Sequence, residues 1–442
     1  MLGLKLNSTW FAVIIVASGT SFVSAEELSN QANEPSSLTQ TLTKALNNNS
    51  QLASARSGFK AIHRTQFVSF ASMLPQVSAY ATGNYTEHME DDILANERQG
   101  QDDSYGIRVD HELFTSGKNL NAFRSKRAEI IKERYNLDSQ EQSTLLSAVQ
   151  VHFDVIRDRA VYELNQKNVA VLSQQLKAVK DRFEVGIVTR TDIAQSEARF
   201  AGARSNLLLA DTAVQSSLAT YLQVVGEVAP VLTNVSPLPE LPSSLSEALD
   251  IGRAESPMLN SAKQNARSAK LSAYSTVSAT LPQVKVSGIY SRYDNKTPSL
   301  IQLEEGETFS VQATVTMPLF SGGRNIANIS AARHASNALT QNVHATASAV
   351  QQSIVVSWHQ NLAATSVVLA RNEQIQASKI ALEGVRQENM LGTRTTLDVL
   401  NAEQALLDAR VNLSRAERDQ YVAAYGLLAS VGRLSGSYLG LN

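Results

Sequence analysis

The sequence predicts an α+β membrane protein with an internal duplication, in which pairs of β-strands alternate with very long α-helices. Three observations support this fold class. Residues 38–228 are echoed by residues 245–434 at an offset of 206 to 207 positions. Long stretches of the 442-residue chain lack proline and are rich in helix-forming residues. Between these stretches, apolar and polar residues alternate with the period of a strand that has one apolar face.

The N-terminal segment 1–25 has the layout of a secretory signal peptide. Lys5 gives a positive start, residues 10–17 form a short apolar core, and Val23-Ser24-Ala25 is a small-residue cleavage site. A membrane anchor is the alternative, but the apolar run is shorter than the roughly 20 residues that a spanning helix needs. We therefore predict that the mature protein is exported.

The duplication sets the expected domain organisation. Leu-Pro-Gln-Val at 74–77 recurs at 281–284, and Leu-Phe at 113–114 recurs at 319–320. Self-similarity at a fixed offset indicates one structural unit built twice. The sequence thus predicts a first repeat at 26–229, a proline-containing linker at 230–244, a second repeat at 245–434 and a C-terminal tail at 435–442.

Strands are expected near 76–114 and 283–320. In each region two alternating segments flank a polar loop, and a length of about ten residues suits a strand that crosses a bilayer. Four strands cannot span a membrane alone, because unpaired edge groups would face hydrocarbon. Other copies must therefore close the sheet, and a dimer would give eight strands and a trimer twelve.

Very long helices are expected at 118–183 and 324–390, each on the order of 100 Å at 1.5 Å per residue. A shorter helix with a seven-residue repeat follows each of them. Such a period specifies left-handed supercoiling, and small residues allow close approach. Packing in a compact core is the alternative, but five heptads present twice favour an extended coiled assembly. The small rows are Ser196, Ala203, Ala210, Ser217 and Val224, then Ala402, Ala409, Ala416, Ala423 and Ser430.

Composition excludes several classes of function. With 39 basic and 41 acidic residues, the chain lacks the basic excess of a nucleic-acid binder. It has no cysteine, which removes thiolate metal sites, cysteine nucleophiles and a lipoprotein anchor. The seven histidines lack metal-ligand spacing, and neither a nucleophile elbow nor a phosphate-binding Gly-Lys-Ser/Thr loop is present. We expect no cofactor, no metal site and no enzymatic activity.

Two segments after the long helices resemble the periplasmic helix-turn segments of the TolC family. They are Val185-Gly186-Ile187-Val188-Thr189-Arg190-Thr191-Asp192 and residues 392–402, and Leu-Pro-Gln-Val before a strand also matches. The resemblance covers essentially the whole mature chain. It implies a homotrimer whose 12-stranded outer-membrane β-barrel is continued by a long α-helical coiled-coil barrel across the periplasm of a Gram-negative bacterium.

The function implied by the resemblance is that of a passive exit duct in tripartite efflux pumps and type I secretion systems. The implied partners are a periplasmic adaptor (membrane fusion protein), an inner-membrane transporter of ABC, RND or MFS type, and outer-membrane lipid. The alternative is a periplasmic coiled-coil adaptor or scaffold without a barrel. A lipid-facing stripe such as Phe309, Val311 and Val315 argues against this alternative.

The resemblance also assigns residues. Asp398 and Asn401 match the pore constriction, where the family carries two acidic residues, so the asparagine leaves one acidic ring. An acid that offsets the dipole at a helix start is the other reading of Asp398. Asp192 and Arg394 match the salt bridge that latches the gate, and two solvated charges are the other reading. The family's latch tyrosine is Asn389 here.

The helix-turn tips are the expected docking site for the adaptor. By resemblance, their residues are Gly186 and Thr189 in the first repeat and Gly392 and Thr393 in the second.

Overall fold

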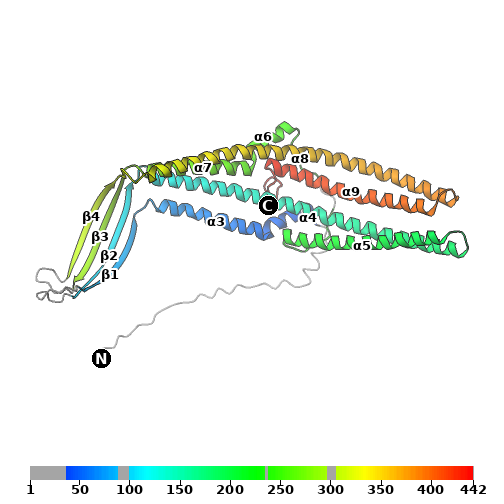
Figure 1. Cartoon of the computed structure of the whole chain (residues 1–442), viewed down its shortest axis with the longest axis horizontal. Helices are drawn as coiled ribbons and strands as arrows, with labels where there is room; N and C mark the ends of the chain where they lie inside the picture. Colours follow the sequence, from blue (N-terminus) through cyan, green and yellow to red (C-terminus); the bar gives the residue numbers. More distant parts are fainter. Residues whose placement is uncertain (1–35, 88–98, 234–236, 296–304, 442) are drawn as a thin grey trace, which may run out of the picture.

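The chain is strongly elongated, with strands at one end and helices at the other (Figure 1). The computed structural model describes residues 36–87, 99–233, 237–295 and 305–441. The expected signal peptide at 1–25 therefore lies outside the described residues, as do most of the two polar loops between strands. The observed elements confirm the α+β class and occur in the same order in both halves of the chain.

Four strands form one antiparallel sheet in the order β1-β2-β3-β4. They are β1 (Gln76–Glu87), β2 (Gln99–Phe114), β3 (Gln283–Asn295) and β4 (Glu305–Thr316). These strands lie within the expected regions, although residues 317–320 follow β4 without strand structure. Within the described residues, β1 and β4 each have one edge without a partner strand, so the sheet is open on both sides.

One face of the sheet presents apolar side chains to the surroundings. The side chains of successive residues in a strand point to opposite faces of the sheet, and residues paired directly across two strands share a face. Val77, Val109 and Val311 lie in one such row, and Phe309 lies in the next row on the same face. Phe309 is 75% exposed and Val311 63% exposed. Large apolar side chains arranged this way need a covering, which hydrocarbon would supply.

Two 67-residue helices, α4 (Lys118–Glu184) and α8 (Arg324–Met390), run away from the sheet. At 1.5 Å per residue each is about 100 Å long. Each is followed by a 36-residue helix, α5 (Arg190–Val225) or α9 (Thr396–Val431), which returns beside it (Figure 1). We call α4 with α5 the first hairpin and α8 with α9 the second hairpin. No helix in the described part of the chain has both the length and the hydropathy needed to cross a membrane.

The small-residue rows are packed inward, as the seven-residue period predicts. Their inward position lets the two helices of each hairpin approach closely. Six members are 0% to 8% exposed, namely Ser196, Ala203, Ala210, Ser217, Ala409 and Ala416.

Shorter helices pack against the long helices α4 and α8. They are α2 (Leu38–Asn48) and α3 (Ser50–Ala71) in the first half, and α6 (Leu245–Glu255) and α7 (Pro257–Ser278) in the second. Helices α3 and α7 lie beside the sheet-proximal parts of the long helices (Figure 1). The two halves thus repeat the same pattern, as the duplication predicts.

The main hydrophobic core joins both halves at the level of these shorter helices. Phe153 from α4, Leu428 from α9 and Leu434 beyond α9 are almost fully buried in it. The expected C-terminal tail is tied to this core, because the Gly436 N–H donates a hydrogen bond of 3.0 Å to the Glu141 carboxylate. The hairpins extend beyond the core, so contacts along their own length determine how they lie relative to each other.

Candidate functional site: the helical tips and the gate

Each hairpin turns on a glycine in the left-handed backbone conformation. Gly186 and Gly392 both have φ of +79°. Side chains disfavour this region, so glycine ends the helix at little cost. The Gly186 N–H donates to the Phe183 carbonyl at 2.9 Å, and the Gly392 N–H donates to the Asn389 carbonyl at 3.0 Å. The two glycines expected at the docking surface therefore have the same structural role in both repeats.

A threonine then caps the returning helix in each hairpin. The Asp192 carboxylate accepts a 2.8 Å hydrogen bond from the Thr189 N–H, and Asp398 accepts a 3.0 Å bond from the Thr395 N–H. Each threonine hydroxyl also donates to the same carboxylate, at 2.7 and 2.8 Å respectively. This is a reciprocal capping box, which satisfies N–H groups left free at a helix start. Both expected gate acids are thus held at the first turn of a helix.

Hydrogen bonding in the capping boxes lowers the pKa of both carboxyls. The main cause is the backbone N–H of Thr189 for Asp192, and that of Thr395 for Asp398, with the threonine hydroxyls adding to it. Donors stabilise the ionised form of a carboxylate. Both side chains are therefore negative at neutral pH, which the expected roles require. The place of Asp398 in a ring of carboxylates remains a prediction.

Arg394 is bound within its own hairpin. Its Nε donates to the Glu388 carboxylate at 2.8 Å, and the Asn389 side-chain amide donates to the Arg394 carbonyl at 2.8 Å. No ion pair between Arg394 and Asp192 occurs within the described chain. Each expected latch residue thus has a local partner, and their mutual salt bridge remains a prediction. Asn389 thereby supports the turn.

Asn401 lies against the first hairpin. Its side-chain oxygen accepts a 2.8 Å hydrogen bond from Nη2 of Arg199 on α5. The neighbouring Leu400 is 3% exposed and packs with Leu172 of α4 and Ala203 of α5. Sequence reasoning missed Arg199, because its partner is 202 positions away and no local pattern links the two.

The surface of the tips is apolar between the polar caps. The exposed fractions are 69% for Val185, 72% for Ile187, 75% for Met390 and 81% for Leu391. Thr393, the remaining expected docking residue, donates its hydroxyl hydrogen to the Glu388 carbonyl at 2.9 Å. Exposed apolar side chains at both turns are a feature of protein-binding surfaces.

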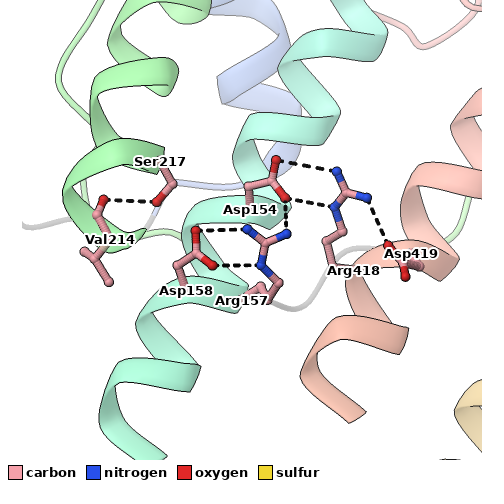
Figure 2. Close-up of polar contacts among 7 residues, drawn as sticks. All are labelled: Asp154, Arg157, Asp158, Val214, Ser217, Arg418 and Asp419. Carbon is pink, nitrogen blue, oxygen red and sulfur yellow. Dashed lines mark hydrogen bonds and ion pairs between the residues drawn. The ribbon is translucent and has the colours of Figure 1, made fainter. Parts of the chain in front are cut away.

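A charged network joins the hairpins closer to the core. Figure 2 shows Asp154, Arg157 and Asp158 of α4 facing Arg418 and Asp419 of α9. Arg418 donates to Asp154 at 2.9 Å and to Asp419 at 2.9 Å. Arg157 donates to Asp154 at 2.6 Å and to Asp158 at 2.8 and 3.0 Å. We call these five residues the charge network. Three of them interrupt an apolar run in the sequence, which is the signal that could have identified them.

A polar cleft of about 530 Å³ lies beside this network. It is lined by α4, α5 and α9, that is, by both hairpins. Asn165 of α4, Asn206 of α5 and Gln404 of α9 contribute amide groups to its wall. The hairpins are therefore separated here. Among the described residues, no group of three or more His, Asp or Glu side chains could hold a metal ion.

Comparison with known proteins gives a consistent assignment. The family model described as outer membrane efflux protein matches residues 41–227 and 248–433. The chain is 32% identical to outer membrane efflux protein BepC of Brucella suis biovar 1 (strain 1330), covering 97% of this chain and 91% of BepC. It is 26% identical to outer membrane protein TolC of Vibrio cholerae, covering 90% of this chain and 91% of that protein. It is 25% identical to alkaline protease secretion protein AprF of Pseudomonas aeruginosa, covering 87% of this chain and 82% of AprF.

The fold is that of solved channels as well. The CmeC outer membrane channel of Campylobacter jejuni superposes with a TM-score of 0.80 at 17% identity, covering 97% of this chain and 94% of CmeC. The family model matches in two blocks, one in each repeat. The chain therefore belongs to the outer membrane efflux protein family, which includes TolC, and is an outer-membrane exit duct for efflux or type I secretion that spans the periplasm.

Proposed function

We propose that three copies of this chain form a single passive duct, to which each copy supplies four barrel strands and two hairpins. The open sheet is the observation that carries this proposal, because β1 and β4 each leave an edge unpaired within the described chain. An unpaired backbone group in hydrocarbon costs several kcal/mol. Strands of neighbouring copies remove that cost, and three copies give twelve strands. The exposed apolar face then contacts outer-membrane lipid.

The tips are the proposed docking site for a periplasmic adaptor of the membrane fusion type. Ile187 and Leu391 present apolar surface there, and the capped turns fix its shape. An inner-membrane transporter of the ABC, RND or MFS type would supply energy, since a passive duct performs no catalysis. BepC is named for efflux and AprF for alkaline protease secretion, so the cargo is either small molecules or proteins.

The proposed gate works by exchange of the partner of Arg394. In the closed duct Arg394 binds Asp192, and in the open duct it binds Glu388, at the 2.8 Å distance found here. Exposed ion pairs contribute only about 0–1 kcal/mol each. Exchange between two such pairs therefore needs little energy, which suits a gate that an adaptor must open.

The export role is tested by deletion and complementation. Loss of the gene should raise drug sensitivity or remove a secreted protein, depending on the cargo, and the wild-type gene should restore the phenotype. The double variant Ile187→Asp and Leu391→Asp should leave assembly and conductance in planar bilayers intact but fail to complement. Full complementation by this variant would exclude the tips as the docking site.

A further inference from the structure

A pocket of about 300 Å³ lies between α7 and α8. The two helices run side by side from the end of the molecule that carries the sheet (Figure 1). The apolar part of the pocket wall is Ala273 and Val277 of α7. The polar part consists of side chains that can donate hydrogen bonds, namely Lys270, Tyr274, Arg333, Ser336 and Asn337. We call these five residues the donor pocket. Its volume is at the lower end of the range for small-molecule sites, about 300 to 1,000 Å³.

The side chains of the donor pocket have no partners within the described part of the chain. None of the five forms a hydrogen bond with another described residue, and neither Lys270 nor Arg333 forms an ion pair there. The two helices also lack compensating acids, because α7 contains no Asp or Glu and α8 contains none over residues 324–372. Two positive charges and three neutral donors are therefore free to bind a ligand.

The first repeat has apolar side chains at the equivalent positions. At the offsets of the duplication, the counterparts of Tyr274, Val277, Ser336 and Asn337 are Phe67, Phe70, Ile130 and Ile131. Phe70 packs edge-on against Phe123 of α4, with ring centroids 6.3 Å apart, and Ile130 is only 6% exposed. Apolar residues thus satisfy the packing of such a helix pair, so packing does not explain the polar side chains of the second repeat.

The donor pocket lies at the level where a bilayer would end. Tyr274 and Lys270 lie four and eight residues before the end of α7, which corresponds to about 6 and 12 Å along the helix. The headgroup layer of a bilayer extends roughly 5 to 8 Å beyond the hydrocarbon core. In the segment that joins β4 to α8, Leu319 and Phe320 are 87% and 89% exposed. A lipid with its headgroup in the pocket would therefore have exposed apolar surface near its acyl chains.

We propose that the donor pocket binds a phosphate group, carried either by an anionic lipid headgroup or by a free phosphate. Lys270 and Arg333 supply the opposite charge, and a guanidinium can bind two phosphate oxygens at once. The hydroxyl and amide groups of the pocket donate to the remaining oxygens. A bound headgroup would join α7 to α8 and fix the depth of the sheet in the bilayer. Only the lipid source rests on the proposed contact of the sheet with lipid; phosphate binding itself does not.

Native mass spectrometry of the purified protein in detergent, titrated with phosphatidylglycerol, tests the site. The wild type should bind one lipid per chain most tightly. Lys270→Gln and Arg333→Gln should each weaken this binding about tenfold, since each removes a charge-assisted bond to phosphate. Arg127→Gln is the matched control, because Arg127 is the counterpart of Arg333 in the first repeat, and it should bind as the wild type does. Unchanged binding by the double variant of Lys270 and Arg333 would overturn the proposal.

A variant with a filled pocket gives a second test. Ser336→Ile with Asn337→Ile places the side chains of the first repeat in the pocket and should abolish binding. The oligomer mass and the conductance in planar bilayers should stay unchanged, so failure of the proposed duct is distinguishable from failure of this site.

Isothermal titration with inorganic phosphate distinguishes the two sources. Binding of phosphatidylglycerol without binding of phosphate assigns the site to a lipid headgroup, and binding of phosphate at one per chain assigns it to a free phosphate. If the wild type bound neither probe, or if the filled variant bound as the wild type does, the proposal would be overturned.

Discussion

At the scale of single residues, the tips combine local capping with weak ion pairs. Asp192 and Asp398 occupy equivalent capping positions, but Arg394 occurs in only one repeat, since its counterpart in the first repeat is Val188. Because of this difference, the turn of the second hairpin carries the arginine that exchanges ion-pair partners in the proposed gate. In the proposed gate, Glu388 and Asp192 compete for the Arg394 guanidinium.

The proposed exchange predicts opposite changes in conductance for substitutions at Arg394 and at Glu388. Arg394→Ser should raise single-channel conductance, because it removes the closed-state pair. Glu388→Gln should lower conductance, because it weakens the open-state partner and leaves Asp192 favoured. Conductance changes in the same direction for both variants would contradict the exchange.

A charge substitution at Asp398 tests the pore constriction. The pKa of Asp398 lies below its usual range, so the carboxylate is ionised at neutral pH. Asp398→Asn should weaken block by divalent and trivalent cations about tenfold, because three charges leave the axis together. Thr395→Ala is the matched control, since it weakens the same capping box and leaves the charge in place. Equal loss of block in both variants would remove Asp398 from the constriction.

The hydrogen-bond and ion-pair partners of the site residues were the part of the site that the sequence could least predict. Asp398 was expected either to line the pore or to offset a helix dipole, and its capping box with Thr395 holds it in the first turn of α9, where an acid is favourable; its role in the pore stays a prediction. The Arg199–Asn401 bond was not expected. Each of these residues looks like an ordinary solvated side chain in the sequence, and only the packing of two distant helices brings them together.

At the scale of elements, the helices and strands could be predicted closely. The long helices were expected at 118–183 and 324–390, and they run over Lys118–Glu184 and Arg324–Met390. A glycine lies close to each end of both helices, and no proline interrupts them. The local sequence alone therefore determines where these helices begin and end. The strands were recognisable because one face is apolar and the period is two.

Capping is an element-scale property and can be measured locally. Thr395→Ala removes the side chain that accepts the Asp398 N–H bond of 3.2 Å and should destabilise the start of α9 by about 1 kcal/mol. Hydrogen exchange of the first-turn amides of α9 should then speed up roughly fivefold. Thr189→Ala should have the same effect confined to α5. Unchanged exchange in both variants would contradict the structural role of the caps.

A buried histidine gives the shorter helices and the core a pH dependence. His152 is 0% exposed and its Nδ1 lies 2.9 Å from the Thr41 hydroxyl. Burial lowers the pKa of His152 to about 4, against an opposing contribution from the backbone of Thr233. The unfolded chain therefore binds the proton more readily. Stability from this group is complete above about pH 6.5 and falls by about 3 kcal/mol as pH drops towards 4.

Thermal unfolding in detergent between pH 4 and 7 measures this effect. His152→Gln should reduce the loss of stability at low pH, whereas His344→Gln, which alters an exposed histidine, should not. An identical pH profile for wild type and His152→Gln would show that His152 does not titrate as its burial implies.

At the scale of the whole molecule, duplication explains both the elongated shape and the open four-stranded sheet. Two repeats provide two strand pairs and two hairpins, which is enough for one sector of a duct (Figure 1). Sequence could predict that the sheet needs neighbours, because four strands cannot close. The number of neighbours came only from the family resemblance, since edge pairing between copies leaves no period in a single sequence.

In the proposed duct, one chain cannot form the pore and three chains can. The most direct measurement combines native mass spectrometry of the detergent-purified protein with conductance of the same sample in planar bilayers. We expect the conducting species to have the mass of three mature chains. Full conductance from a species with the mass of one chain would contradict it.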